Sequence, residues 1–143
     1  MDQLVIDRSM TVFEWIDIAA DLPVDGLEMY DGFFESLDEA YLASVRSALQ
    51  RCNFEMPMLC CSSDFTKPDA DERSQEVGRQ KRMIDATAHL GGRFCRVLSG
   101  QRRPEVSRQQ GMAWVVECIR ALLDYAAERN VVLAMENHYK DNY

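Results

Sequence analysis

A glutamate and a histidine, Glu136 and His138, lie two residues apart at the end of the most strand-like segment of the sequence, residues 131–138. Side chains of an extended segment alternate between two faces. One face carries Val131, Leu133 and Met135, and the other carries Val132, Ala134, Glu136 and His138. A carboxylate and an imidazole at this spacing can both bind one divalent cation, or one can bind the metal while the other orients a substrate. The alternative is that the pair only marks the start of a solvated loop.

Two further charged residues are placed where they could line the same site. Glu28 lies near the end of an earlier strand-like segment, with Tyr30 on its face, and Arg96 lies within an otherwise apolar one. An arginine that is buried in a sheet needs a counter-charge, because an unpaired buried charge is very costly. An ion pair between Glu28 and Arg96 is therefore one prediction. The alternative is that the Arg96 side chain extends to the rim of the sheet.

Other reactive or charged residues give weaker signals. Arg102 and Arg103 could hold a substrate phosphate or carboxylate, although an arginine pair in a loop is more often solvated. Cys60 and Cys61 lie in a strand-like segment, and we expect them to pack in the core rather than to act as nucleophiles.

The polar residues must be positioned by strands that alternate with helices. Helical periodicity covers residues 11–22, 37–51, 72–90 and 109–129, and strands are predicted at residues 26–30, 55–62, 94–99 and 131–138. The first helix begins with a capping box, Thr11 followed three residues later by Glu14.

This order predicts an α/β fold with about four parallel strands and four helices. Strands that recur every ~30 to 40 residues with a helix between them form βαβ units. The two compatible architectures are a doubly wound sheet and a partial TIM (β/α)8 barrel, and both bind ligands at the carboxyl ends of their strands. No G-x-G-x-x-G motif follows a predicted strand, so the sequence lacks the motif that would best indicate a dinucleotide-binding sheet.

The composition fits a single globular domain, residues 1–143, with 47% hydrophobic and 28% charged residues. A net charge of −8 argues against a nucleic-acid partner, because binding to a phosphate backbone depends on many Lys and Arg contacts. The apolar runs are too short for a membrane span, and no secretory signal is recognisable. With five cysteines and no C-x-x-C pair, we expect a cytoplasmic protein with reduced thiols.

Several short motifs occur in the order that is found in one enzyme family. They are Pro23-Val24-Asp25-Gly26-Leu27-Glu28, Ser63-Asp64-Phe65-Thr66, Ile84-Asp85 with Leu90-Gly91, Arg96-Val97 with Gly100, and Leu133-Ala134-Met135-Glu136-Asn137-His138. Together they resemble the sugar phosphate isomerase/epimerase family, the xylose isomerase-like TIM barrels, over nearly the whole chain from Thr11 onward.

The resemblance implies an enzyme that uses a divalent metal (Mn²⁺, Mg²⁺ or Zn²⁺) and acts on a sugar, sugar phosphate or polyol by proton transfer next to a carbonyl. In such enzymes the glutamate that ends the fifth strand binds the metal, and here that position is Glu136, the metal ligand and catalytic candidate. His138 would line the substrate site, and Glu28 and Arg96 are the further substrate-binding candidates. A cation would polarise the carbonyl, and a nearby carboxylate would serve as base if its pKa were raised toward neutrality.

The resemblance also indicates what the sequence lacks. A complete barrel of this kind has about 250 residues. Residues 3–6 are too short for a full first strand, and the family's further metal ligands, on later strands, have no counterpart. We therefore expect an N-terminal portion that is not active alone and binds metal weakly. With its open sheet edges, we expect it either to form a homo-oligomer or to be only marginally stable and prone to aggregate. The alternatives are a non-catalytic half-barrel that works by association with another chain, and an endonuclease-IV-like DNA repair enzyme of the same fold.

Overall fold

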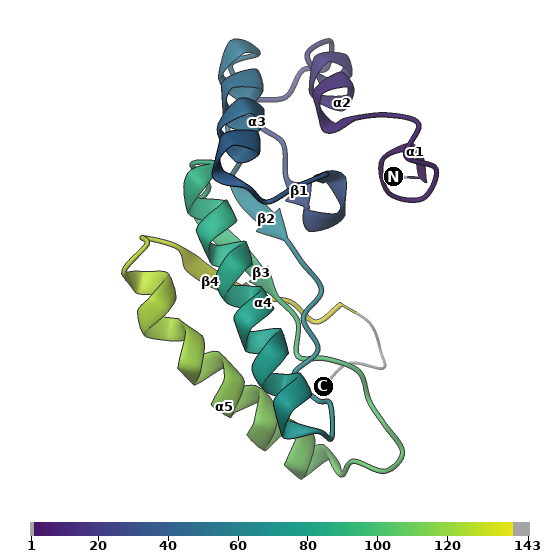
Figure 1. Cartoon of the computed structure of the whole chain (residues 1–143), viewed down its shortest axis with the longest axis vertical. Coiled ribbons are helices and arrows are strands. Elements are labelled where there is room, and N and C mark those ends of the chain that lie inside the picture. The colour runs from purple at the N-terminus through teal and green to yellow at the C-terminus, as the bar shows by residue number, and fades with distance from the viewer. Residues whose placement is uncertain (1, 139–143) are drawn as a thin grey trace.

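The structure is a computed structural model that describes residues 2–138. Its centre is a parallel sheet of four strands in the order in which they occur along the chain (Figure 1). The strands are β1 (Met29–Tyr30), β2 (Met58–Cys60), β3 (Phe94–Val97) and β4 (Val132–Met135). The helices that precede them are α2 (Val12–Ala19), α3 (Glu39–Arg51), α4 (Ala70–His89) and α5 (Arg108–Ala127). This alternation confirms the predicted α/β fold.

Two short helices complete the described chain. Residues 3–6, which are too short for a first strand, lie in and just after the helix α1 (Asp2–Val5), and a 3₁₀ helix, η1 (Asp31–Phe33), follows β1 directly. None of the helices among residues 2–138 is both long and apolar enough to cross a membrane.

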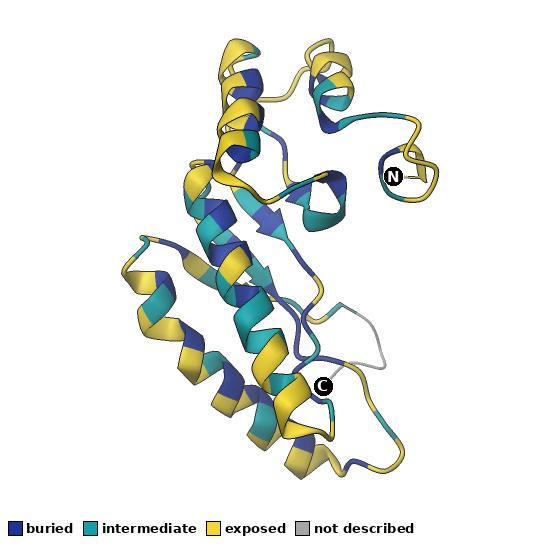
Figure 2. Ribbon diagram, viewed as in Figure 1, coloured by how far each residue is buried: buried dark blue, intermediate teal, exposed yellow. Residues whose placement is uncertain are grey.

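The strand register separates a face of the sheet that packs on the helices from an open face. The row that packs under the helices consists of Met29, Leu59, Cys95 and Leu133. The first three of these side chains are at most 1% exposed. The neighbouring residues of each strand point the other way, and this second row consists of Tyr30, Cys60, Arg96 and Ala134. In Figure 2 the inner sides of α3, α4 and α5 are buried while their outer sides are exposed.

The helix ends use the local signals present in the sequence. At the start of α2 both halves of the predicted capping box form: the Glu14 N–H donates to Thr11 Oγ1 at 3.2 Å, and the Thr11 N–H donates to Glu14 Oε2 at 2.7 Å. Helix α4 begins two residues before its predicted start at residue 72, because the Asp69 carboxylate accepts hydrogen bonds from the N–H groups of Asp71 and Glu72.

The strands are shorter than the sequence predicted, at two to four residues each. Beyond the ends of β2 and β3, hydrogen bonds from one side chain take the place of the backbone-to-backbone hydrogen bonds that join paired strands. The Ser63 hydroxyl accepts from the Leu98 N–H at 3.0 Å and donates to the Leu98 carbonyl at 2.9 Å. The chain therefore continues in an extended direction toward the carboxyl-end loops without being part of the sheet.

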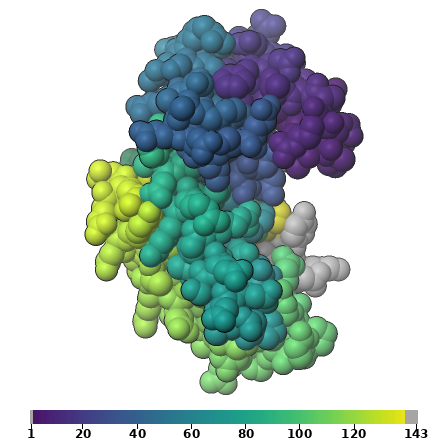
Figure 3. Space-filling model, viewed as in Figure 1, coloured from purple at the N-terminus to yellow at the C-terminus, as the bar shows by residue number. Residues whose placement is uncertain are grey.

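Apolar surface is exposed beside the edge strand β4 and on the outer side of α5. Val132 and Met135 are 46% and 53% exposed, and the large exposed apolar side chains of α5 are Met112, Val116 and Leu123. A groove of about 250 Å³ lies between α5 and Met135. In the space-filling view α5 runs along the lower left side of the molecule, away from the N-terminal helices at the top (Figure 3).

Candidate active site at the carboxyl ends of the strands

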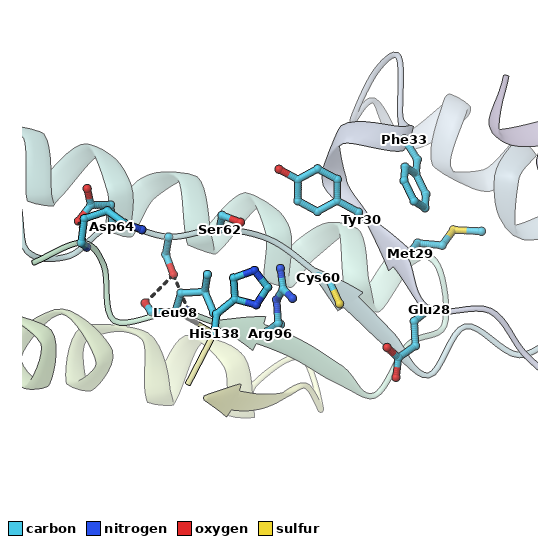
Figure 4. A pocket seen from close by; sticks show the side chains of 12 residues that line it. Glu28, Met29, Tyr30, Phe33, Cys60, Ser62, Asp64, Arg96, Leu98 and His138 are labelled. Carbon is cyan, nitrogen blue, oxygen red and sulfur yellow. Dashed lines mark hydrogen bonds between the residues drawn. The ribbon is translucent and has the colours of Figure 1, made fainter. Parts of the chain in front are cut away.

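A cavity of about 500 Å³ opens at the carboxyl ends of the strands, on the side of the sheet that the helices leave uncovered. Figure 4 shows its lining, with Arg96 and His138 side by side and the aromatic rings of Tyr30 and Phe33 across from them. The lining residues are Glu28, Met29, Tyr30, Phe33, Cys60, Ser62, Ser63, Asp64, Arg96, Leu98, Gln101 and His138. Three of the four candidate residues from the sequence therefore line one cavity, and Glu136 contacts two of these.

The ion pair of Arg96 differs from the predicted one. Arg96 Nη1 donates to Glu136 Oε2 at 3.1 Å, and no ion pair joins Arg96 to Glu28 among the described residues. The register explains the choice of partner. Arg96 pairs with Ala134 of the adjacent strand β4, two residues before Glu136, whereas the whole of β2 separates β3 from the strand that follows Glu28. The alternative of an Arg96 that extends to solvent is wrong as well, since its side chain is only 13% exposed.

The second oxygen of Glu136 faces His138. Nδ1 of His138 lies 2.8 Å from Glu136 Oε1, so a proton on Nδ1 is donated to the carboxylate. This hydrogen bond and the ion pair with Arg96 outweigh the opposing effect of burial and lower the pKa of Glu136. Glu136 thus remains an anion at neutral pH. A base that removes a proton next to a carbonyl works best with a pKa near neutrality, so the environment of Glu136 suits a fixed negative charge better than a base.

Glu28 and Cys60 occupy the side of the cavity next to β1. Glu28 is exposed and lines the cavity with Cys60, whose thiol lies between Glu28 and Arg96 in Figure 4. Burial raises the pKa of the Cys60 thiol, although the nearby Arg96 acts in the opposite direction. The prediction that both neighbouring cysteines pack in the core is correct for Cys61, which is 1% exposed, and wrong for Cys60, which lines the cavity.

An ion pair that the sequence analysis missed closes the rim of the cavity. Arg103 Nη2 donates to Asp64 Oδ2 at 2.6 Å, and Arg103 Nη1 donates to Thr66 Oγ1 at 2.9 Å. Burial raises the pKa of Asp64, but the hydrogen bonds from Arg103, Thr66 and the Gln101 N–H outweigh it and hold that pKa below its usual value. The expectation of a solvated Arg103 is therefore wrong, and only Arg102 of the pair is exposed.

A second missed ion pair holds η1 against α4. Arg79 Nη2 donates to Asp31 Oδ2 at 2.6 Å, and Arg79 Nη1 donates to the Ser62 carbonyl at 2.8 Å. Arg79 thus joins the segment after β1 to the segment after β2 and fixes the wall of the cavity that carries Tyr30 and Phe33. The sequence signal was weak, because a charged residue in a long helix is usually on its solvated side.

The described residues do not by themselves fit a divalent metal. Residues 2–138 hold no group of three or more His, Cys, Asp or Glu side chains that could coordinate an ion. Glu136 and His138 provide two candidate ligands, but the guanidinium of Arg96 and the imidazole itself engage the two carboxylate oxygens. A protein metal site usually has three or four protein ligands.

The chain has no match among curated proteins. Its fold does match solved structures. A protein from Sinorhizobium meliloti 1021 has a TM-score of 0.80 at 21% identity, covering 98% of this chain and 52% of its own. D-psicose 3-epimerase from Clostridium cellulolyticum H10, solved with D-tagatose, has a TM-score of 0.78 at 14% identity, covering 92% and 48%. The IolI protein with a binding zinc atom has a TM-score of 0.76 at 15% identity, covering 93% and 49%.

These comparisons identify the architecture. The chain spans about half the length of the structures that it matches, and its four parallel strands correspond to part of a closed TIM barrel. The doubly wound alternative is thereby removed. Residues 16–143 match the sequence profile described as xylose isomerase-like TIM barrel. The chain therefore belongs to the xylose isomerase-like TIM barrel family.

Proposed function

We propose that this chain contributes metal- and substrate-binding residues to a divalent-metal-dependent isomerase or epimerase of sugars, sugar phosphates or polyols. The observation that carries the proposal is the cavity at the carboxyl ends of the strands, where Glu28, Arg96 and His138 converge beside Glu136. A small polar ligand needs a few well-placed polar groups in a cleft of this size. Membership of the family and the fold shared with D-psicose 3-epimerase support the proposal.

In this proposal Glu136 is a ligand of the metal and the central catalytic residue, and its lowered pKa keeps it in the charged form that a metal requires. The metal is Mn²⁺, Mg²⁺ or Zn²⁺. The other ligands come from outside residues 2–138, because these hold no third candidate side chain near Glu136 and His138. The zinc atom in the structure of IolI supports a metal in proteins of this fold.

The remaining polar residues bind the substrate. His138, Arg96 and Glu28 offer hydrogen-bond donors and acceptors to hydroxyl groups across the cavity. Of the three substrate classes, an uncharged sugar or polyol fits best. The charges of Asp64 and Arg103 cancel in their ion pair, and the two carboxylates of Glu28 and Glu136 outnumber the one guanidinium of Arg96. The charge that remains is negative and repels a phosphate group.

Saturation-transfer NMR on the whole chain tests the proposal. With Mg²⁺ present, we expect transfer from the protein to D-tagatose or D-psicose and none to ribose 5-phosphate at the same concentration. Glu136→Gln should weaken the metal-dependent part of the signal, while the matched variant Glu117→Gln, on the exposed side of α5, should not. Equal transfer from wild type and Glu136→Gln would contradict the role of Glu136, and binding of the phosphate alone would contradict the substrate class.

One observation favours a second candidate, a non-catalytic half-barrel that acts by association with another chain. It is the lack of a third metal-ligand candidate among the described residues. If the affinity for the sugar is the same with and without divalent metals, the result would favour this candidate over an enzyme. No feature of the described cavity favours the endonuclease alternative, since its residual negative charge disfavours a phosphate backbone.

A further inference from the structure

The cavity at the carboxyl ends of the strands has two sides of different chemistry. Arg96 and His138 line one side, and the rings of Tyr30 and Phe33 line the side across from them (Figure 4). Phe33 is 8% exposed, whereas Tyr30 is half-buried, so Tyr30 is the more accessible of the two rings. An uncharged sugar also has two kinds of surface, because its hydroxyl groups are polar and its C–H groups are apolar. The cavity therefore offers a partner to each kind.

The ring of Tyr30 is held in place by the segment that follows it. It lies so close to the backbone of Gly32 that a Cβ there would come within 2.6 Å of Tyr30 Cε1. The Phe33 ring packs against it edge to face, with a centroid distance of 6.0 Å and an interplanar angle of 79°. The ion pair of Asp31 and Arg79, at 2.6 Å, fixes η1, which carries these contacts. A ligand thus meets a ring that is already ordered, which lowers the entropic cost of binding.

The hydroxyl of Tyr30 is available to a ligand. Tyr41 Oη accepts a hydrogen bond from the Glu35 N–H at 3.3 Å. Tyr125 Oη donates to Asp85 Oδ2 at 2.8 Å. The Tyr30 hydroxyl, in contrast, makes no hydrogen bond within the described part of the chain. In Figure 4 the ring extends from the end of β1 toward the interior of the cavity, with the hydroxyl at its tip. A phenol hydroxyl both donates and accepts, so it can bind a sugar hydroxyl in either sense.

We propose that Tyr30 is a further specificity-determining residue of this cavity. Its ring packs against the C–H groups of an uncharged sugar, and its hydroxyl forms a hydrogen bond with one hydroxyl of that sugar. The inference rests on the proposed function in one respect, the binding of a sugar in this cavity. Tyr30 lies on another strand than Glu136 and His138 and is not one of the candidate metal ligands.

Saturation-transfer NMR titration of the whole chain with D-tagatose tests the inference. Tyr30→Phe removes only the hydroxyl and should weaken binding by about three- to tenfold, the range for one hydrogen bond between uncharged groups. The matched control is Tyr125→Phe, which removes a hydroxyl outside the cavity lining and should change the affinity by less than about twofold. An affinity of Tyr30→Phe within about twofold of the wild type would overturn the inference.

A second variant tests the role of the ring. Tyr30→Leu removes the aromatic surface together with the hydroxyl, so it should bind D-tagatose at least about threefold more weakly than Tyr30→Phe. Equal affinities of Tyr30→Leu and Tyr30→Phe would overturn the packing of the ring against the sugar. Circular dichroism of each variant establishes that the fold is intact.

The monodeoxy analogues of D-tagatose show whether the hydroxyl of Tyr30 contacts the sugar directly. The loss of affinity caused by Tyr30→Phe should persist for every analogue except one. It should disappear for the analogue that lacks the hydroxyl bound by Tyr30, because the two changes then remove the same hydrogen bond. An equal loss for all the analogues would mean that the Tyr30 hydroxyl makes no contact with the sugar, and would overturn the inference.

A measurement on the wild type covers the case in which the Tyr30 variants do not fold. The chain is labelled with ¹³C in its tyrosine rings and titrated with D-tagatose. The Tyr30 signals should shift as the sugar binds, and the Tyr125 signals should remain in place. If D-tagatose binds while the Tyr30 signals stay unchanged, only the inference fails. If the wild type binds neither D-tagatose nor D-psicose, the proposed function fails, and the inference fails with it.

Discussion

The guanidinium of Arg103 holds the carboxylate of Asp64 with an Nη2–Oδ2 distance of 2.6 Å, although the two residues are 39 positions apart in the sequence. The ion pair joins the loop after β2 to the loop after β3, the two segments that form the rim of the cavity. Both side chains are mostly buried, at 20% and 23% exposure. The carboxyl-end loops are thus fixed to each other and not only to their own strands.

Loss of this ion pair should destabilise the fold and change how it responds to acid. Arg103→Met should lower the free energy of unfolding by about 1.5–3 kcal/mol, the range for hydrogen bonds to a charged group. The folded pKa of Asp64 lies below its unfolded value, so its contribution to stability is present above the unfolded pKa of about 3.9 and is lost as the pH falls through the folded pKa. Urea unfolding at pH 7 and at pH 3 measures both effects.

The matched control for this experiment is Arg102→Met. Arg102 is exposed, so its loss should change the free energy of unfolding by less than about 0.5 kcal/mol. The Arg103→Met variant should lose less stability than the wild type between the two pH values. If both proteins lost the same unfolding free energy between pH 7 and pH 3, the ion pair would contribute nothing to the sensitivity of the fold to acid.

Two glycines should respond in opposite directions to substitution by alanine. Gly100 has φ +119°, and a Cβ there would come within 2.7 Å of Thr66 Oγ1. We expect Gly100→Ala to cost at least about 2 kcal/mol of stability, from backbone strain and overpacking. Gly78 lies within α4 with no atom within 4 Å of an added Cβ, so Gly78→Ala should stabilise by about 0.5–1 kcal/mol. Denaturant unfolding of the two variants measures the contrast, and equal effects would contradict it.

The five cysteines should differ in their reaction with a thiol reagent. Cys52 and Cys60 are partly exposed, whereas Cys61, Cys95 and Cys118 are buried. Because burial raises the pKa of Cys60, its modification should be slow at neutral pH and should accelerate as the pH rises. A sugar that fills the cavity should protect Cys60 and not Cys52, which lies elsewhere. Mass spectrometry of the labelled peptides would contradict the placement of Cys60 if both sites were protected equally.

The exposed apolar surface beside β4 should make the chain associate. An unpaired parallel edge and an apolar helix face favour contact with a further copy. We expect the sedimentation coefficient to rise with concentration, and Val116→Asp, on α5, to suppress the rise. Val24→Asp, at a residue of similar exposure before β1, is the matched control. A compact monomer whose cooperative thermal unfolding is independent of concentration would contradict this prediction.

The sequence predicted the order of elements well, because their signals are local. The capping box of Thr11 and Glu14 and the periodicity of the helices depend on residues within one or two turns, and all four pairs of helix and strand are present. The ends of the strands were less accurate. The positions of these ends depend on a contact between residues 35 positions apart. There the Ser63 hydroxyl, and not the backbone of the neighbouring strand, bonds to the backbone of Leu98.

The candidate site was predicted in outline and missed in its ion pairs. Glu28, placed on the same face as Tyr30, and Arg96, noted as a charge within an apolar strand, both line the cavity. The pairing of charges across the sheet depends on strand order and register, which local sequence patterns do not provide. Arg96 was therefore assigned to Glu28 instead of Glu136, and Arg103 was assigned to solvent instead of Asp64.

A crystal structure of the chain soaked with Mn²⁺ and D-tagatose tests the proposed function most directly. The account predicts sugar hydroxyls within about 3.2 Å of the side chains of Glu28 and His138. It also predicts an anomalous Mn²⁺ peak at the carboxylate of Glu136. Sugar bound outside the cavity, or Mn²⁺ bound away from Glu136, would contradict the account.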